Sequence, residues 1–292
     1  MKMRTATALL VALTILATAC ADAPTEPGDG GGTGGGGIAH PTGGGDVLLR
    51  ISSEGGFVPV EYLLTSVPGF TLFGDGTVVT QGAQTEIYPG PALPPMIATP
   101  VTEAGIQALL EAAVAAGLDE DQTYTDMGSV GVADATTTVF TLTVDGVSHV
   151  TKVYALGMMT GEQPPRMSDE EYAVRTKLER LQASLQDLRT TLPDGAVGED
   201  ATFTPGGLRL FITAYRGADL KQPPVEWPLS TPIASVGEPT QVEDFTCAAL
   251  TGADLEAVLP LAQSANQLTP WKSDGERYTI LSRPLLPDES GC

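Results

Sequence analysis

The chain has 292 residues, of which 36 are acidic and 15 are basic, so its formal net charge is −21. A surface with this charge disfavours nucleic acid and anionic lipid head groups as partners. The three cysteines lie far apart in the chain, which excludes the usual Cys and His spacing of a zinc site. We therefore expect an acidic globular protein that binds no nucleic acid, metal or cofactor.

The first 19 residues have the layout of a secretory signal peptide. Lys2 and Arg4 provide a short positive region, and the uncharged stretch 6–19 consists of apolar and small residues. This stretch is shorter than the about 20 residues that a membrane-spanning helix needs. We therefore interpret residues 1–19 as an export signal and predict no transmembrane helix in the mature chain.

Cys20 is the predicted site of lipid attachment. The residues before it, Leu16-Ala17-Thr18-Ala19, resemble the lipobox of bacterial lipoproteins, although Leu16 lies one position earlier than in that motif. The same residues also fit an ordinary signal peptidase site, which would leave a soluble protein. An odd number of cysteines in an oxidising compartment leaves one without a disulfide partner. Lipidation of Cys20 would leave Cys247 and Cys292 as one disulfide pair, and this argument from cysteine parity favours the lipoprotein. The expected location is extracytoplasmic, anchored by lipid to the bacterial membrane.

Residues 20–45 are dominated by glycine and are predicted to form a flexible tether, because such a segment buries too little apolar surface to fold. A coil of this length has a root-mean-square reach of roughly 25–30 Å. The remaining chain, about 245 residues, is long enough for one large domain or two small ones. We divide it into the regions 46–160 and 161–292.

The first region begins with two predicted strands, Asp46–Ser52 and Phe57–Thr65, the second at a sheet edge or bulge because it contains Pro59. Residues 70–80 predict a hairpin that turns at Asp75-Gly76. A helix is expected over about 103–116, with an apolar face. A second hairpin, 136–156, is expected to turn at Asp145-Gly146.

The second region opens at Ser168 with a capping box, which predicts a helix that ends before Pro193. Its leucine stripe could seat a partner helix, but packing on the protein's own sheet is the favoured interpretation. A strand over 208–215, an irregular segment over 217–245 and a helix over about 251–265, kinked or split at Pro260, follow. The predicted fold class is α+β, with antiparallel hairpins packed against a few helices.

Two segments resemble bacterial exported proteins. Residues 47–157, with GDGT in the first hairpin and DATTT before the second, resemble a small secreted domain of unknown function. The C-terminal residues Arg283-Pro284-Leu285-Leu286-Pro287-Asp288-Glu289 and the final cysteine resemble uncharacterised tethered lipoproteins of high-GC Gram-positive bacteria. These resemblances imply an envelope location and carry no activity.

No catalytic motif emerges from the sequence. His149 is the single histidine after the tether, and we interpret it as structural rather than as a general base. Residues 128–131 (GSVG) lack the first glycine of a nucleophile elbow. Residues 119–126 begin like a calcium loop, but Tyr124 replaces its turn glycine and Val130 its twelfth-position Glu. A pair of catalytic carboxylates, which depends on spatial distance, is not identifiable from spacing alone.

Two classes of function follow. The favoured one is a cell-envelope lipoprotein that presents a non-catalytic interaction or structural domain, with the membrane as a partner through its lipid and an envelope protein or glycan as the other. The alternative is an envelope hydrolase that acts on carbohydrate or peptide through paired carboxylates.

Overall fold

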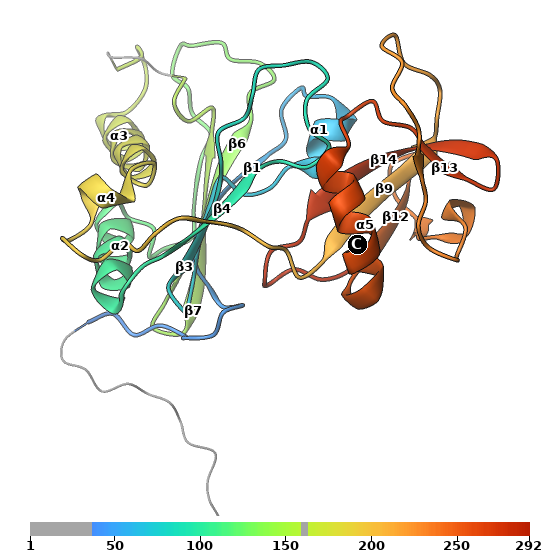
Figure 1. Cartoon of the computed structure of the whole chain (residues 1–292). Coiled ribbons are helices and arrows are strands. Elements are labelled where there is room, and N and C mark those ends of the chain that lie inside the picture. Colours follow the sequence, from blue (N-terminus) through green and yellow to red (C-terminus); the bar gives the residue numbers. More distant parts are fainter. Residues whose placement is uncertain (1–36, 159–162) are drawn as a thin grey trace, which may run out of the picture. The chain divides into compact units, whose positions relative to one another are not determined.

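The computed structural model describes residues 37–158 and 163–292. The predicted signal peptide, Cys20 and most of the tether lie outside these residues. The predicted α+β class is confirmed: the described part of the chain contains helices and two sheets in which antiparallel pairing predominates (Figure 1). Within it, no helix combines the length and the apolar character needed to cross a membrane.

The first sheet has eight strands in the order β5-β7-β6-β1-β2-β3-β4-β8. Every neighbouring pair is antiparallel except β5 and β7. The strands are β1 (Val47–Glu54), β2 (Phe70–Phe73), β3 (Thr77–Gln81), β4 (Met96–Pro100), β5 (Gln122–Tyr124), β6 (Thr137–Val144), β7 (Val147–Tyr154) and β8 (Ala201–Thr202).

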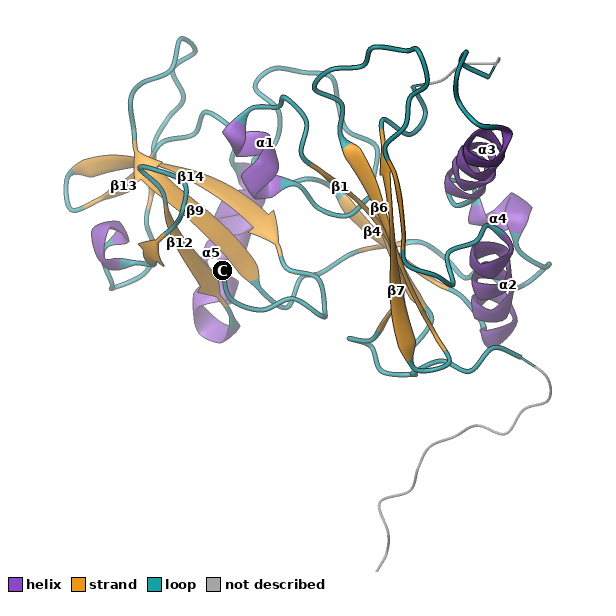
Figure 2. Ribbon diagram, turned by 180° about the vertical axis from the view of Figure 1, so that it is seen from behind, coloured by secondary structure: helices purple, strands orange, loops and turns teal. Residues whose placement is uncertain are grey.

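One face of this sheet is covered by α2 (Glu103–Ala115), α3 (Asp169–Ser184) and α4 (Leu188–Thr191) (Figure 2). The leucine stripe of α3 packs into the core beneath the helices: Leu178 and Leu181 are buried there with Phe140 and Leu142 of β6. The stripe therefore serves the protein's own sheet, as expected. Both α3 and α4 belong to the region 161–292 but pack on the first sheet. The division of the chain into the regions 46–160 and 161–292 stays a prediction.

The second sheet has six strands in the order β10-β13-β14-β9-β12-β11. Its core includes an edge-to-face pair, Trp227 and Trp271, whose ring centroids are 5.9 Å apart. The remaining elements are α1 (Val60–Thr65), β9 (Leu208–Ala214), β10 (Val225–Glu226), the 3-10 helix η1 (Ile233–Ser235), β11 (Glu238–Pro239), β12 (Thr246–Leu250), α5 (Gly252–Ser264), β13 (Trp271–Ser273) and β14 (Glu276–Pro284).

Both predicted hairpins of the first region are present, as β2–β3 and β6–β7. Helix α2 matches its predicted range and is followed by Gly117 at a φ of +90°. The Ser168 hydroxyl caps α3 by accepting a hydrogen bond from the Glu171 N–H, as the capping box predicts. The helix expected to continue to Pro193 instead ends at Ser184, and α4 begins after Asp187, whose carboxylate caps it.

The predicted strand Phe57–Thr65 is wrong, because residues 60–65 form the short helix α1. Pro59 has no N–H to give to a strand partner, and its carbonyl accepts the N–H groups of Tyr62 and Leu63 instead. The split predicted at Pro260 is also wrong, since α5 is one helix from Gly252 to Ser264 with Pro260 inside it, and the alternative of a kink there stays a prediction.

Arg175, on α3, has no exposed surface. Its guanidinium donates hydrogen bonds to the carbonyl oxygens of Tyr154 and Asp126, at 2.8 and 3.0 Å, and to the Glu171 carboxylate at 3.0 Å. A third carbonyl, of Tyr124, lies 3.3 Å away. This one side chain therefore fixes α3 over the ends of β5 and β7.

The two sheets are joined by the C-terminal residues 283–292, which we call the C-terminal latch. The Arg283 Nε donates to the Ser66 carbonyl at 2.7 Å, and its two terminal nitrogens bind the Glu289 carboxylate at 2.7 Å each. Arg50 of β1 makes a second bidentate pair, with Asp288. Leu286 is buried against Phe73 and other residues of the first sheet. The latch thus connects the end of β14, in the second sheet, to the first sheet.

Replacing Arg175 with Met should lower the free energy of unfolding by about 3–5 kcal/mol, because three carbonyls and a carboxylate would lose their buried donor. Urea denaturation measures the change. Arg180→Met, on an exposed position of the same helix, is the control and should change stability by less than about 0.5 kcal/mol. Equal midpoints for the two variants would contradict the role given to Arg175.

Candidate functional site

The loop between β3 and β4, residues 82–95, reaches from the first sheet to the second; we call it the strap. The Ala92 N–H donates to the Ala265 carbonyl at 3.1 Å, and the Gln267 N–H donates to the Gly90 carbonyl at 2.9 Å. Leu93 packs against the core of the second sheet. The strap therefore lies beside the C-terminal end of α5 in a fixed position.

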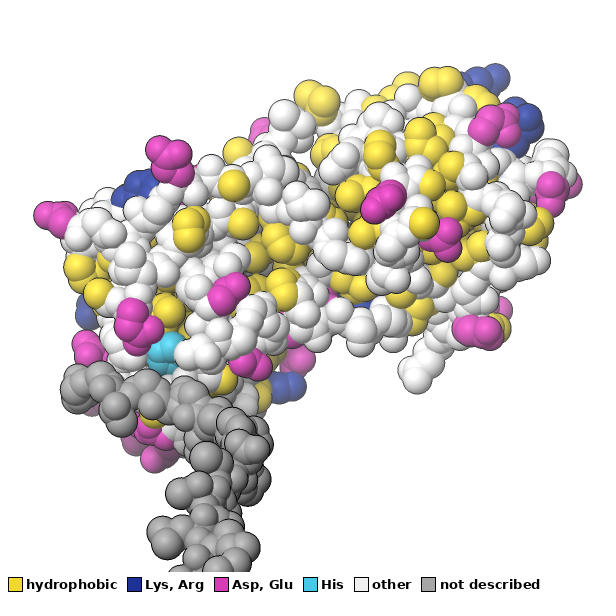
Figure 3. All heavy atoms as spheres, turned by 60° about the horizontal axis from the view of Figure 1, so that its bottom comes forward, with side chains coloured by type: hydrophobic (Ala, Val, Ile, Leu, Met, Phe, Trp, Pro, Cys, Tyr) yellow, Lys and Arg dark blue, Asp and Glu magenta, His cyan; other side chains and the backbone are white. Residues whose placement is uncertain are grey.

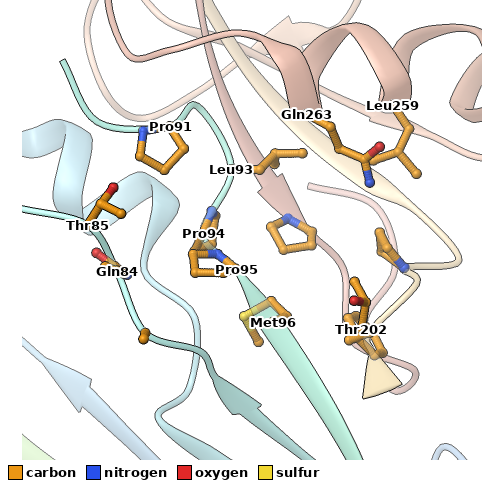
Figure 4. A pocket seen from close by; sticks show the side chains of 14 residues that line it. Gln84, Thr85, Pro91, Leu93, Pro94, Pro95, Met96, Thr202, Leu259 and Gln263 are labelled. Carbon is orange, nitrogen blue, oxygen red and sulfur yellow. The ribbon is translucent and has the colours of Figure 1, made fainter. Parts of the chain in front are cut away.

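A groove of about 330 Å³ lies between the strap, α5, the end of β8 and the latch. Figure 4 shows Pro91, Pro94 and Pro95 of the strap along one side of the groove, with Leu259 and Gln263 of α5 on another. The volume is within the range of small-ligand pockets. The groove is consequently the candidate binding site.

None of the 14 residues that line the groove is charged. Five are prolines, whose rings are apolar and whose nitrogens donate no hydrogen bond. The polar side chains are amides and hydroxyls, such as those of Gln84, Gln263 and Thr202. In an acidic chain, such a lining suits an uncharged and largely apolar occupant and offers no acid or base for catalysis.

A second cavity, of about 280 Å³, lies between the α3–α4 turn and the β3–β4 hairpin and contains two carboxylates. Asp200 accepts hydrogen bonds from the Thr99 hydroxyl at 2.7 Å and from Arg189 at 3.0 Å. Asp187 accepts from the Thr190 hydroxyl at 2.6 Å, and this bond, with the Thr190 N–H, lowers its pKa. Both carboxylates are thus engaged by hydrogen-bond donors of the protein.

His149 lies on β7 with its Nδ1 4.0 Å from an oxygen of Asp121. That oxygen also accepts the Val150 N–H at 2.7 Å, so Asp121 is engaged by the backbone. Within residues 37–158 and 163–292, neither a serine hydroxyl nor a cysteine thiol forms a hydrogen bond with His149. The arrangement therefore provides an acceptor for the imidazole without the nucleophile of a catalytic triad.

The calcium-like residues 119–126 do not wrap around a common centre. Residues 122–124 form the strand β5, Asp121 binds the backbone of β7, and Asp126 caps the Gly128 N–H at 2.7 Å. Among the described residues, no group of three or more His, Cys, Asp or Glu side chains could hold a metal ion. The tight backbone turn of a calcium loop is replaced here by extended chain.

Cys247 and Cys292 are joined by a disulfide with a Cα–Cα distance of 5.9 Å. It ties the last residue of the latch to β12, and the Arg209 Nε holds the neighbouring Gly291 carbonyl at 2.8 Å. Burial, and then the charge of Arg283, lowers the pKa of Arg209. Cys20, the predicted lipidation site, lies outside the described residues.

The groove was missed by the sequence analysis, which assigned no role to residues 82–101. Its local signal is the run of prolines in the strap, Pro89, Pro91, Pro94 and Pro95, which favours an irregular segment without backbone donors. The other walls come from α5 and from residues near 203 and 284, which only the tertiary structure brings together.

Burial raises the pKa of the Glu289 carboxyl, but the hydrogen bonds from Arg283 and the Leu286 N–H outweigh it, so the pKa lies below its ordinary 4.5. A folded-state pKa below the unfolded-state pKa stabilises the protein at pH values above the unfolded-state pKa, and this stabilisation is lost as the pH falls through the folded-state pKa.

Wild type should therefore lose stability below about pH 4.5 more steeply than Glu289→Gln. Melting temperatures from pH 7 to 3 provide the measurement, with exposed Glu256→Gln as control; parallel curves for wild type and Glu289→Gln would oppose this role.

Comparison with known proteins gives no relative: no family model matches the chain, and no curated protein or solved structure matches it either.

Proposed function

We propose that this protein is an exported lipoprotein, anchored through Cys20, whose folded body binds a partner in the cell envelope without catalysing a reaction. The proposal of an anchor rests on the sequence of residues 1–20, on the glycine-rich tether after it and on cysteine parity. The disulfide between the other two cysteines supports the parity argument. It also fits export, because disulfides persist in oxidising compartments.

The observation that carries the binding role is the uncharged groove beside the strap. The prolines and Leu259 give the groove apolar surface, and its burial by an occupant is favourable because it removes that surface from water. The amides of Gln84 and Gln263 can orient an occupant by hydrogen bonds. Its walls are fixed by the strap and latch contacts, so little ordering is required on binding. These properties favour recognition over acid–base chemistry.

The second candidate function is an envelope hydrolase that uses Asp187 and Asp200, because both line the second cavity. A glycosidase of this kind needs one carboxyl group that stays protonated to act as the general acid. The donors around Asp187 lower its pKa instead, and Arg189 and Thr99 bind Asp200. The site therefore supports hydrolysis less well than the groove supports binding.

Cys20→Ala should move the protein from the membrane fraction to the soluble exported fraction and abolish its labelling by a radioactive or alkyne fatty acid. Cell fractionation under high salt and fatty-acid labelling measure the two effects. The matched control is Cys292→Ala, which also removes one cysteine but should remain labelled and membrane-bound. Retention of the Cys20→Ala protein in washed membranes would refute the anchor.

Purified protein should show no turnover above background with glycan, peptide and ester substrates, since the two carboxylates of the second cavity are held by hydrogen bonds from Thr190, Thr99 and Arg189. Asp187→Asn and Asp200→Asn are the informative variants, and exposed Asp194→Asn is their control. Turnover that disappears in the first two variants but persists in the control would establish the hydrolase and overturn the non-catalytic role.

A further inference from the structure

The strand register divides the first sheet into two ends. Val47, Phe73, Val144 and Val147 lie at one end, while Glu54, Thr80, Thr137 and Tyr154 lie at the other. The first end is contacted by the described part of the segment 20–45, because the Asp145 N–H in the β6–β7 turn donates to the Ala39 carbonyl. We call it the attachment rim, since Cys20 precedes this segment.

The opposite end, the distal rim, is formed by the loops that join the strands there. These loops are residues 55–69, which include α1, the strap 82–95, the segment 125–136, and the described residues 155–158 and 163–168. In Figures 1 and 2, α1 and the loops around it lie at the end of the sheet opposite the β6–β7 turn. From β7 to β4 the rim covers five strand spacings, about 24 Å.

Exposed apolar side chains concentrate at the distal rim. Of the ten large hydrophobic residues that are exposed among those described, seven lie in its loops. Phe57 is 87 % exposed, Tyr88 71 % and Ile87 68 %. The other four are Tyr62, Leu63, Val130 and Met158. Aromatic residues and Met are enriched in protein interfaces, and exposed apolar patches mark interaction sites.

The loops that carry these side chains are tied to one another. The Phe57 N–H donates to the Asp134 carbonyl at 3.1 Å, and the Ser129 N–H donates to the Pro165 carbonyl at 2.8 Å. The Tyr154 hydroxyl donates to the Val132 carbonyl at 3.1 Å. The groove opens between the strap and α5, next to the strap segment that bears Ile87 and Tyr88. Three of the loops are thus held together by hydrogen bonds, and the groove adjoins the strap, which is the fourth.

The charge of the distal rim is acidic. Its described loops contain four acidic residues and one basic residue: Glu61, Glu86, Asp126, Asp134 and Arg166. All five are exposed. Figure 3, which turns the attachment end forward, shows acidic side chains scattered over that face as well. The rim shares the acidic character of the chain.

We propose that the distal rim docks an envelope protein with a basic surface, whose apolar side chains contact Phe57, Ile87 and Tyr88 and enter the groove. This proposal rests on the proposed binding function and adds where the partner sits and what its surface is like. Acidic residues beside an apolar patch attract a cationic protein and fix its orientation. The described end of the segment 20–45 contacts the opposite rim, through the Ala39 carbonyl.

The same charges disfavour the other occupants. A symmetric contact between two copies would bring the four acidic residues of one rim against those of the other. An anionic membrane surface would repel them too, because basic rather than acidic segments bind such surfaces. A standard interface covers about 800 Å² on each partner, which is compatible with a rim about 24 Å long.

The test uses the full, anchored chain in its own cells, with a photo-crosslinking phenylalanine analogue at Tyr88 or Met158. Leu220, an exposed apolar residue of the second sheet region, is the control position. We expect the two rim positions to give the same adduct, which mass spectrometry identifies as one protein of basic isoelectric point. The control position should not give this adduct. Glu86→Lys with Asp134→Lys should reduce the yield about tenfold or more, whereas Asp194→Lys, outside the rim, should not.

An adduct with a second copy, with lipid or with an acidic protein would overturn the proposal, as would an equal yield from Leu220 or no adduct from either rim position. Circular dichroism of each purified variant verifies that it folds. A second double variant, Phe57→Ser with Ile87→Ser, should also reduce the crosslinking yield, without reversing any charge. If Cys20→Ala still releases the protein while the rim gives no adduct, the docking proposal alone fails.

Discussion

The structure depends on the buried guanidinium of Arg283. A cation removed from water is costly unless each of its donors is bound, and here Glu289 takes two of them while the Ser66 carbonyl takes a third. Ser66 precedes the first sheet's β2, whereas Arg283 lies next to the last residue of β14 in the second. The need to satisfy one desolvated charge therefore joins the two sheets. It also sets the path of the latch, which places Leu286 in the core beneath the first sheet.

The groove is a consequence of this joining. Pro284, next to Arg283, lines it, and so do Met96 at the start of β4 and Leu259 of α5. A shift of the latch would move one wall relative to the others. Because the strap contacts the end of α5 through backbone hydrogen bonds, the groove is held from two sides. The groove therefore combines backbone contacts on two sides with a lining that carries no charge.

The antiparallel register gives the first sheet its functional polarity. Strands β1, β3 and β7 all end at the distal rim, and β2, β4 and β6 begin there, so loops far apart in sequence are gathered at one end. The described part of the segment 20–45 reaches the other end, where the Ala39 carbonyl accepts the Asp145 N–H. The proposed docking of a basic partner rests on the acidic residues among those loops.

The sequence by itself determined the local elements whose signals are short-range: the two Asp-Gly hairpins, helix α2 with Gly117 after it, and the Ser168 cap of α3. These depend on backbone conformations that a few adjacent residues impose. The segment 57–65 was misread because its apolar composition suits a strand, while Pro59 and the absence of a strand partner make residues 60–65 helical. Only the tertiary structure decided that Arg283 meets Ser66 across 217 positions, that the strap meets α5, and that seven exposed apolar residues share one rim. Such contacts depend on long-range strand pairing and on the burial of charge, which no local pattern encodes.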